Sequence, residues 1–448
     1  MILVKNKHVA KICAGLMTVS LLSGCAILGG GGDKKKDTPT LGKRMNILTG
    51  ESGAEVDPAL AGISVIVPTP RENADWAQPG GNAGKSMGHV ALGSATTRVW
   101  TADVSGTNKR ERLAAAPVVS DGRLYVVDTQ AMVHAFDAVT GAKIWSTQIE
   151  VKNDVKSSRF GGGVSALGSM VYATNGVGDV VALNAADGSE LWKVRPAGPL
   201  RGAPTLSNGN VYVMTQDNQV YALKQSDGAV QWNEAGTVGL AGIFGVAAPA
   251  AAQGTVIAGY SSGELTAYRY ENGRNLWNDA LARTSISTSV ATLSDIDADP
   301  VIDRGRVFAL GQGGRMAAYE LVTGQRIWEL NIAGIATPVV AGEWVFVLTD
   351  DAKLLCIARP TGKVRWISQL EAYRNQKKKK NPINWNGPVL AGNRLIVAST
   401  EGDVVSVSLG EGSSTTLVNL KQSVSLPPIV AGGMLYILDD SGRISAFR

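Results

Sequence analysis

Few side chains in this 448-residue sequence have the types and the spacing that catalysis or metal binding requires. The three histidines, His8, His89 and His134, lie far apart, and His134 in VHAFD is more typical of a strand residue than of a ligand. No H-x-x-x-H, C-x-x-C, G-x-S-x-G or P-loop pattern occurs. Asp295 and Asp297 alternate in a loop without an evident base or metal-ligand set around them. The sequence therefore predicts no catalytic residue, no metal site and no cofactor, and it leaves the two acids as solvated turn residues or as a partner contact.

Cys25 is the one cysteine with a chemical context. Residues 1–25 have a basic start (Lys5, Lys7, Lys11) and an apolar run, Ile12–Ser23, that is too short to span a bilayer. The run ends in Leu-Ser-Gly-Cys, which resembles a bacterial lipobox, in which Cys25 would be acylated and become the first mature residue. The alternative is an ordinary signal peptide with an incidental cysteine. Ala26 follows in place of an inner-membrane retention Asp, so the resemblance implies the periplasmic side of a Gram-negative outer membrane.

The charge and the composition narrow the class further. Residues 26–70 are rich in Gly, Lys and Asp, which predicts a flexible tether. Ten of the 43 Lys and Arg residues belong to three basic groups, and without them 33 remain against 38 Asp and Glu. The three groups are Lys5, Lys7 and Lys11, then Lys34–Lys36, and then Lys377–Lys380. A basic surface for nucleic-acid binding is therefore missing.

The cysteines of the mature chain cannot form a disulfide with each other. Because Cys13 belongs to the signal, only Cys356 remains besides Cys25. We expect no intrachain disulfide and a buried Cys356 thiol.

The remainder of the chain is a repeat. Each copy holds three or four short runs of β-branched and aromatic residues separated by Asp-Gly or Thr-Gly turns, which predicts an antiparallel four-stranded meander. The distance from an opening Pro to a closing Trp is 28 residues in five copies: Pro117/Trp145, Pro204/Trp232, Pro249/Trp277, Pro300/Trp328 and Pro338/Trp366. A sixth copy begins at Val164 and ends at Trp192, and a seventh begins at Pro388 and has Thr416 at the closing position.

The eighth copy begins at Pro428 and stops at Arg448, before its fourth strand. Trp100 has no Pro 28 residues ahead of it, so a strand from Ala95 to Val104 is the expected donor of the missing strand. Closure of the ring would remove exposed sheet edges. We therefore predict an all-β fold, an eight-bladed β-propeller of four-stranded antiparallel blades over residues 71–448.

Seven tryptophans occupy equivalent positions in this repeat, which favours packing between blades over a ligand cage. These structural residues are Trp100, Trp145, Trp192, Trp232, Trp277, Trp328 and Trp366.

The ends of the repeats, such as FDAVTGAKIW and YELVTGQRIW, resemble the repeat of quinoprotein dehydrogenases, in which eight blades surround pyrroloquinoline quinone and calcium. That resemblance concerns architecture. The adjacent Cys-Cys pair that many of these enzymes carry is missing here. A periplasmic quinoprotein-type dehydrogenase that uses the quinone and calcium is thus the alternative function, and a lipoprotein that adheres to an external ligand is a weaker one.

The lipobox-like segment, the tether and the eight repeats together resemble the BamB family, the propeller lipoproteins of the machinery that folds β-barrels into the bacterial outer membrane. The resemblance extends from Cys25 to Arg448. It implies a non-enzymatic, lipid-anchored scaffold that binds the POTRA domains of BamA within the assembly complex. Contact with unfolded outer-membrane proteins is a further hypothesis.

In that family two loops on one face carry the partner contact. A Ser-Asp-x-Asp stretch is matched by Ser294–Asp297, which makes Asp295 and Asp297 candidate contacts. The second loop reads Gly-Ile-Phe-Gly, with Phe244 where the family has Arg, so Ile243 and Phe244 imply a more apolar contact. The long loop between Tyr373 and Trp385, with Lys377–Lys380, is expected to be a solvated insertion.

Overall fold

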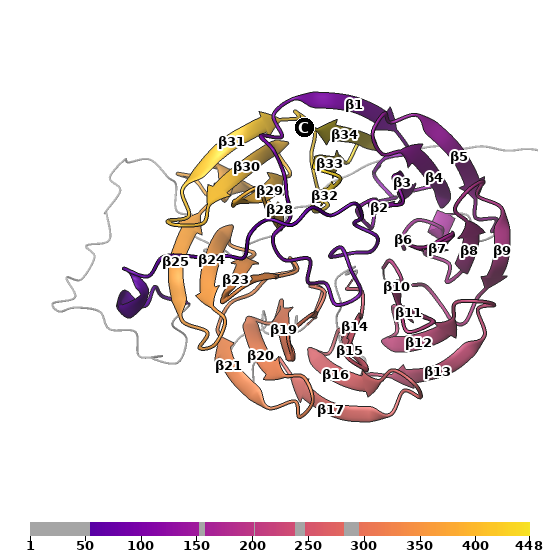
Figure 1. Cartoon of the computed structure of the whole chain (residues 1–448), viewed down its shortest axis with the longest axis horizontal. Helices are drawn as coiled ribbons and strands as arrows, with labels where there is room; N and C mark the ends of the chain where they lie inside the picture. Colours follow the sequence, from indigo (N-terminus) through magenta and orange to yellow (C-terminus); the bar gives the residue numbers. More distant parts are fainter. Residues whose placement is uncertain (1–53, 152–156, 201, 238–246, 282–294) are drawn as a thin grey trace, which may run out of the picture. The chain divides into compact units, whose positions relative to one another are not determined.

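The computed structural model describes residues 54–151, 157–200, 202–237, 247–281 and 295–448. Its strands form eight four-stranded antiparallel sheets arranged as the blades of a ring (Figure 1). This confirms the predicted eight-bladed all-β propeller. The described ranges contain the short 3-10 turn η1 (Pro58–Leu60), and no helix in them is long and apolar enough to span a membrane.

The blades follow the sequence repeat, and each contains consecutive strands from the axis outward. Blades 1 to 4 are β2 (Val118–Ser120), β3 (Arg123–Val127), β4 (Met132–Asp137) and β5 (Lys143–Gln148); β6 (Val164–Leu167), β7 (Met170–Thr174), β8 (Val180–Asn184) and β9 (Glu190–Val194); β10 (Thr205–Ser207), β11 (Asn210–Met214), β12 (Gln219–Lys224) and β13 (Val230–Ala235); and β14 (Ala250–Ala252), β15 (Thr255–Gly259), β16 (Glu264–Arg269) and β17 (Asn275–Ala280).

Blades 5 to 7 are β18 (Val301–Asp303), β19 (Arg306–Gly311), β20 (Arg315–Glu320) and β21 (Arg326–Leu330); β22 (Val339–Ala341), β23 (Trp344–Leu348), β24 (Lys353–Ala358) and β25 (Val364–Gln369); and β28 (Trp385–Ala391), β29 (Arg394–Ser399), β30 (Asp403–Ser408) and β31 (Ser414–Asn419). A separate hairpin, β26 (Tyr373–Asn375) and β27 (Lys380–Pro382), lies between blades 6 and 7 in the chain.

Blade 8 combines the two ends of the ring. Its inner strands are β32 (Ile429–Ala431), β33 (Met434–Leu438) and β34 (Arg443–Phe447), and its outer strand is β1 (Arg98–Asp103). Trp100 pairs with Ala446 in the antiparallel register between β1 and β34. The N-terminal strand thus supplies the missing fourth strand, six residues long within the predicted Ala95–Val104 range.

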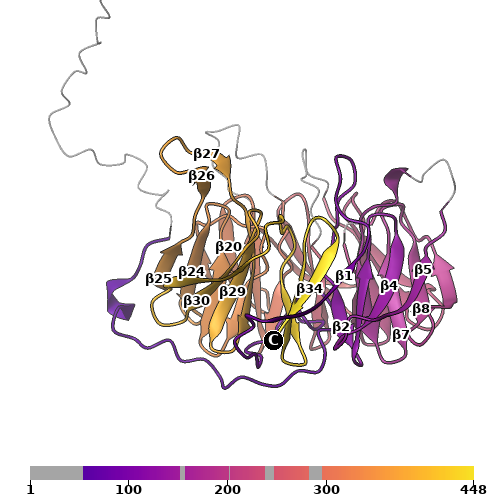
Figure 2. The same cartoon turned by 90° about the horizontal axis from the view of Figure 1, so that it is seen from above.

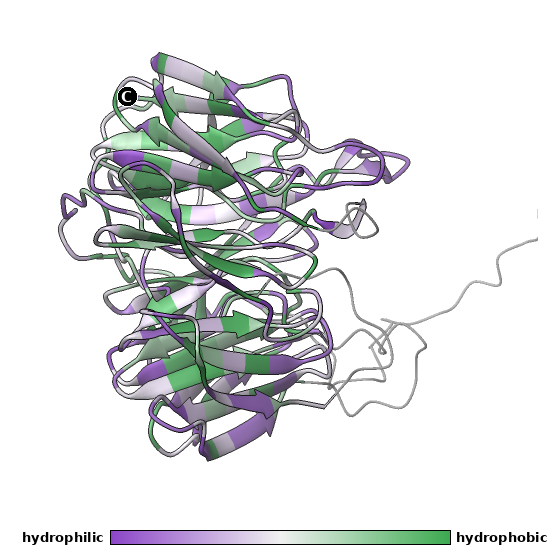
Figure 3. Cartoon of the chain, turned by 90° about the vertical axis from the view of Figure 1, so that its right-hand side faces the viewer, coloured by the Kyte–Doolittle hydropathy of each residue, from purple (hydrophilic) through white to green (hydrophobic). Residues whose placement is uncertain are grey.

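The hydrophobic core consists of layers between neighbouring blades. One buried cluster joins blades 1 and 2, others join each following pair, and the largest joins blades 7, 8 and 1. Figure 3 shows the hydrophobic stretches along the strands and the hydrophilic residues concentrated at the loops. Cys356 is fully buried in one of these layers, and burial raises the pKa of its thiol.

Each of the seven repeat tryptophans lies against the next blade. The indole Nε1–H donates to a backbone carbonyl there, over 2.8–3.1 Å: Trp100 to Ala138, Trp145 to Ala185, Trp192 to Gln225, Trp232 to Tyr270, Trp277 to Leu321, Trp328 to Arg359 and Trp366 to Leu409. The ring also covers the turn glycine of that next blade, so that a Cβ on Gly324 would lie 2.5 Å from Trp277. Trp100 therefore locks blade 8 onto blade 1, across the closing seam.

The segment before β1 departs from the prediction. The compact unit that contains the ring begins at Gly50, whereas the tether was expected to continue to residue 70. Val56 forms a parallel bridge to Val364 on the outer strand of blade 6, and Asp57 accepts an ion pair from Lys363 at 2.8 Å. Val65 and Val67 also pack against the core between blades 6 and 7. The Gly-, Lys- and Asp-rich composition of residues 26–70 as a whole suggested a tether and concealed these contacts near its end.

Candidate functional site

Residues 71–92, here called the strap, line the inside of the ring. This stretch runs through the centre of the propeller (Figure 1) and lies toward the lower edge of the ring in Figure 2. Hydrogen bonds join it to the innermost strands of seven blades, through Val119, Ala166, Leu206, Ala251, Ile302, Leu390 and Gly432. Since the middle residues of those short strands have free backbone groups at the axis, the strap satisfies them.

A cavity of about 220 Å³ lies on the axis above the strap. Trp76, Lys85 and Met87 of the strap contribute to its lining, and its walls are the segments that lead into the innermost strands, including 335–340 and 425–429. These segments carry the prolines that open the repeats, so the wall is apolar and has few N–H donors. The structure thus contains a small apolar cavity with the strap at one end.

One pair of opposite charges is buried beside this cavity. Lys85 Nζ donates to Thr205 Oγ1 at 2.9 Å, and Asp299 accepts from the Ala248 N–H at 2.6 Å. Burial lowers the pKa of Lys85 to about 8, although the charge of Asp299 opposes the shift. Burial likewise raises the pKa of Asp299 against the charge of Lys85. Each charge offsets only part of the other's desolvation, and the hydrogen bond from Lys85 to Thr205 links the strap to blade 3.

The residues of the channel do not fit a quinone with calcium. The strap occupies part of the axis, and Lys85, the only cation among the described residues that line the cavity, already donates to Thr205 and interacts with the charge of Asp299. Calcium prefers six to eight oxygen ligands. In the ranges that the structure describes, no group of three or more His, Cys, Asp or Glu side chains could hold a metal ion.

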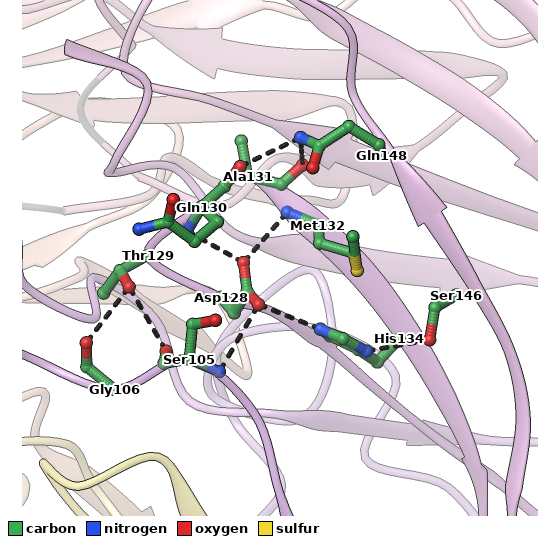
Figure 4. A network of polar contacts seen from close by, with 10 residues as sticks. All are labelled: Ser105, Gly106, Asp128, Thr129, Gln130, Ala131, Met132, His134, Ser146 and Gln148. Atoms are coloured by element: carbon green, nitrogen blue, oxygen red, sulfur yellow. Dashed lines mark hydrogen bonds and ion pairs between the residues drawn. The ribbon is translucent and has the colours of Figure 1, made fainter. Parts of the chain in front are cut away.

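A Ser-His-Asp arrangement in blade 1 was not predicted (Figure 4). His134 Nδ1 lies 2.9 Å from Ser146 Oγ, and His134 Nε2 lies 3.0 Å from Asp128 Oδ2. In hydrolases this set activates a serine nucleophile. Here Ser146 is opposite His134 in the regular β4–β5 ladder, whereas nucleophiles of that class are typically held on a sharp strained turn. Sequence spacing gave no signal because the three residues meet only through the strand register.

The network is better explained as a turn cap. Asp128 Oδ1 accepts from the N–H groups of Gln130 and Met132 at 2.8 and 3.0 Å. Asp439 and Ser399 cap the same turn in blades 8 and 7 without a histidine. Burial opposes ionisation of Asp128, but the hydrogen bonds from His134 and the turn outweigh it and lower its pKa. Blade 1 therefore uses a histidine to support a feature that the repeat already has.

The candidate partner contacts do not lie as the sequence suggested. Asp295 is fully buried and Asp297 is 8% exposed, so neither carboxylate projects from the surface. Ile296 between them packs in the layer between blades 4 and 5, and Asp297 lines the axial cavity. Alternation placed both acids together but could not show that they point inward. Ile243, Phe244 and Cys25 lie outside the described residues.

The sequence is similar to that of known outer-membrane assembly factors. A family model described as outer membrane protein assembly factor BamB matches residues 86–156 and 151–368. Among curated relatives, the factor of this name from Yersinia pestis is 29% identical over 356 residues, covering 78% of this chain and 88% of the relative. Its counterpart from Escherichia coli K12 is 27% identical over 327 residues, covering 62% and 81%.

Solved structures show the same fold. BamB from Moraxella catarrhalis superposes with a TM-score of 0.66 at 19% identity, covering 79% of this chain and 99% of that one. Quinohemoprotein alcohol dehydrogenase from Comamonas testosteroni superposes with a TM-score of 0.64 at 14% identity, covering 84% and 80%. At these identities the similarity establishes the propeller fold alone, and the function has to be argued from the residues of the site.

Proposed function

Because the chain belongs to the BamB family of outer membrane protein assembly factors, we propose that it acts in outer-membrane protein assembly as a non-enzymatic scaffold that binds BamA. The observation that supports a scaffold is the strap, which fills part of the axis that a dehydrogenase of this fold would need for its cofactor. The Ser-His-Asp network caps a turn, so it does not support a hydrolase either.

The surface that supports partner binding is the face that carries the links between blades. The links before blades 4 and 5 include Ile243, Phe244, Asp295 and Asp297. Since both acids are buried, they have a structural role in this proposal, and the apolar pair makes the contact with the POTRA domains. Apolar anchors at the centre of an interface commonly supply most of its affinity.

Two matched double variants test this contact. Ile243→Ser with Phe244→Ser should weaken binding to purified POTRA domains at least tenfold, which is about 1.4 kcal/mol. Ile144→Ser with Leu191→Ser is the control, because these residues are 42% and 50% exposed on the outer strands of blades 1 and 2. Equal affinity of the first variant and the wild type would place the contact elsewhere. A quinone- and calcium-dependent dye reduction would instead favour the dehydrogenase.

We place the protein on the periplasmic side of a Gram-negative outer membrane, anchored by acylated Cys25. The Leu-Ser-Gly-Cys ending supports this location. Cys25→Ser should move the protein from the membrane fraction to soluble or unprocessed protein when BamA is depleted. If the variant still sediments with outer membranes under that condition, lipid anchoring is wrong.

A further inference from the structure

The insertion with four consecutive lysines forms an ordered hairpin. Strands β26 and β27 pair through Tyr373 with Pro382 and Asn375 with Lys380, and the turn between them holds the other three lysines. Every residue from Arg374 to Pro382 is exposed. The hairpin projects past the ring at the upper edge of Figure 2, whereas the strap lies near the lower edge.

The base of the hairpin is fixed to the propeller. Ile383 is 6% exposed, and its N–H donates to Ala372 O at 2.9 Å. Trp385 Nε1 donates to Glu371 O at 2.9 Å, and Arg374 forms an ion pair with Glu401 of blade 7. The projecting lysines are therefore held at a fixed place on the ring, which a solvated loop would not provide.

The four lysines are a local excess of positive charge. None of them forms an ion pair within the part of the chain that the structure describes, although Arg374 at the base does. Beyond the basic runs in the signal, the tether and this hairpin, 33 Lys and Arg face 38 Asp and Glu. An anionic surface would therefore attract the hairpin and repel most of the remaining protein.

The hairpin follows directly in the chain from the blade that contacts the N-terminal segment. Val56 pairs with Val364 on β25, and Arg365 of β25 donates from Nε to Ile63 O at 2.7 Å. Strand β25 leads directly into β26. Among the described residues, the segment before the strap thus contacts blade 6, whose outer strand leads into the hairpin.

We propose that Lys377–Lys380 bind an anionic phospholipid surface and so give the ring a second membrane contact beside its lipid anchor. A protein partner fits this tip less well, because protein interfaces need an apolar core and are depleted in lysine. A charged bilayer requires only uncompensated cations within reach of its surface. The location argument relies on the proposed anchor at Cys25, but the binding itself does not.

Vesicle binding of the full chain without its acyl groups tests the proposal. More protein should sediment with phosphatidylglycerol vesicles than with phosphatidylcholine vesicles. Salt at about 0.5 M, which shortens the electrostatic screening length to about 4 Å, should abolish the difference. Replacing the four lysines by glutamine should lower the partition coefficient about fivefold for each lysine replaced. The control replaces Lys143, Lys224, Arg269 and Arg274 of blades 1, 3 and 4 by glutamine, which removes the same charge from other exposed sites.

The outcomes separate the membrane from other partners. Because all four lysines are exposed, both variants should melt as the wild type does, and only the hairpin variant should lose vesicle binding. Equal binding to anionic and neutral vesicles, or equal loss in both variants, would overturn the proposal. Loss of POTRA binding with vesicle binding retained would assign the lysines to an acidic protein surface. No acyl chain or BamA is present in the vesicle assay, so its failure leaves the proposed function standing.

Discussion

Replacing Gly324 by alanine should destabilise the ring far more than the same change at Gly305. Both glycines lie in blade 5 in the left-handed region, with φ of +71° for Gly324 and +75° for Gly305. An added Cβ at Gly305 has nothing within 4 Å, whereas at Gly324 it lies 2.5 Å from Trp277 Cγ and 2.6 Å from Cδ2. The pair therefore isolates the contact between a tryptophan and the next blade from the backbone strain.

The magnitudes follow from those contacts. Both variants incur the left-handed strain of a residue with a Cβ, about 1–2 kcal/mol. At Gly324 the Trp277 ring must also move about 1 Å to reach normal contact, which adds about 1–3 kcal/mol of overpacking. That movement stretches the 2.8 Å hydrogen bond from Trp277 Nε1 to Leu321 O, and such a bond contributes about 1 kcal/mol. We expect losses of about 1–2 kcal/mol at Gly305 and about 3–5 kcal/mol at Gly324.

Urea denaturation followed by tryptophan fluorescence measures both losses. A third variant, Trp277→Ala with Gly324→Ala, removes the ring and with it the clash, so its cost should be less than the sum of the two single changes. Equal destabilisation by Gly324→Ala and Gly305→Ala would refute the reasoning, because it would mean that the ring yields without cost. Additivity in the double variant would refute it independently.

Three further changes test other parts of the structure. In the wild type, the free energy of unfolding should rise between about pH 8 and 10.5, because the unfolded chain there still binds the proton that buried Lys85 has released. Lys85→Met should abolish this rise, and an unchanged pH profile of unfolding would contradict the reasoning. Asp295→Arg with Asp297→Arg should lower the melting temperature, because both acids are buried; an unchanged melting temperature would show that they are accessible. Deleting residues 95–104 should destabilise the ring, since blade 8 loses β1, and unchanged melting would mean that the ring closes in another way.

The ring could be predicted because its determinants repeat. A constant spacing between Pro and Trp marks five of the eight blades, and the unpaired Trp100 indicates the strand that completes blade 8. The path of the strap could not be predicted, since backbone hydrogen bonds to the innermost strands hold it and such bonds leave no side-chain pattern. The same limit applies to Asp295 and Asp297: alternation gives a shared direction, and only the burial of both acids in the structure shows that they point inward.

The lysine hairpin shows a further limit of the sequence. Four consecutive lysines predicted a solvated insertion, and the residues are indeed exposed. What the sequence does not show is that Ile383 and Trp385 fix the base of the hairpin, so that its charge has a definite position between blades 6 and 7. The fixed place of the four lysines on the ring makes them a candidate membrane contact, and this place depends on tertiary packing.

The affinity of the acyl-free chain for the purified POTRA domains of BamA tests the central claim most directly. The scaffold proposal predicts saturable binding by the wild type and by the Ile144→Ser, Leu191→Ser control, with at least tenfold weaker binding by the Ile243→Ser, Phe244→Ser variant. Absence of saturable binding by the folded wild type would contradict it.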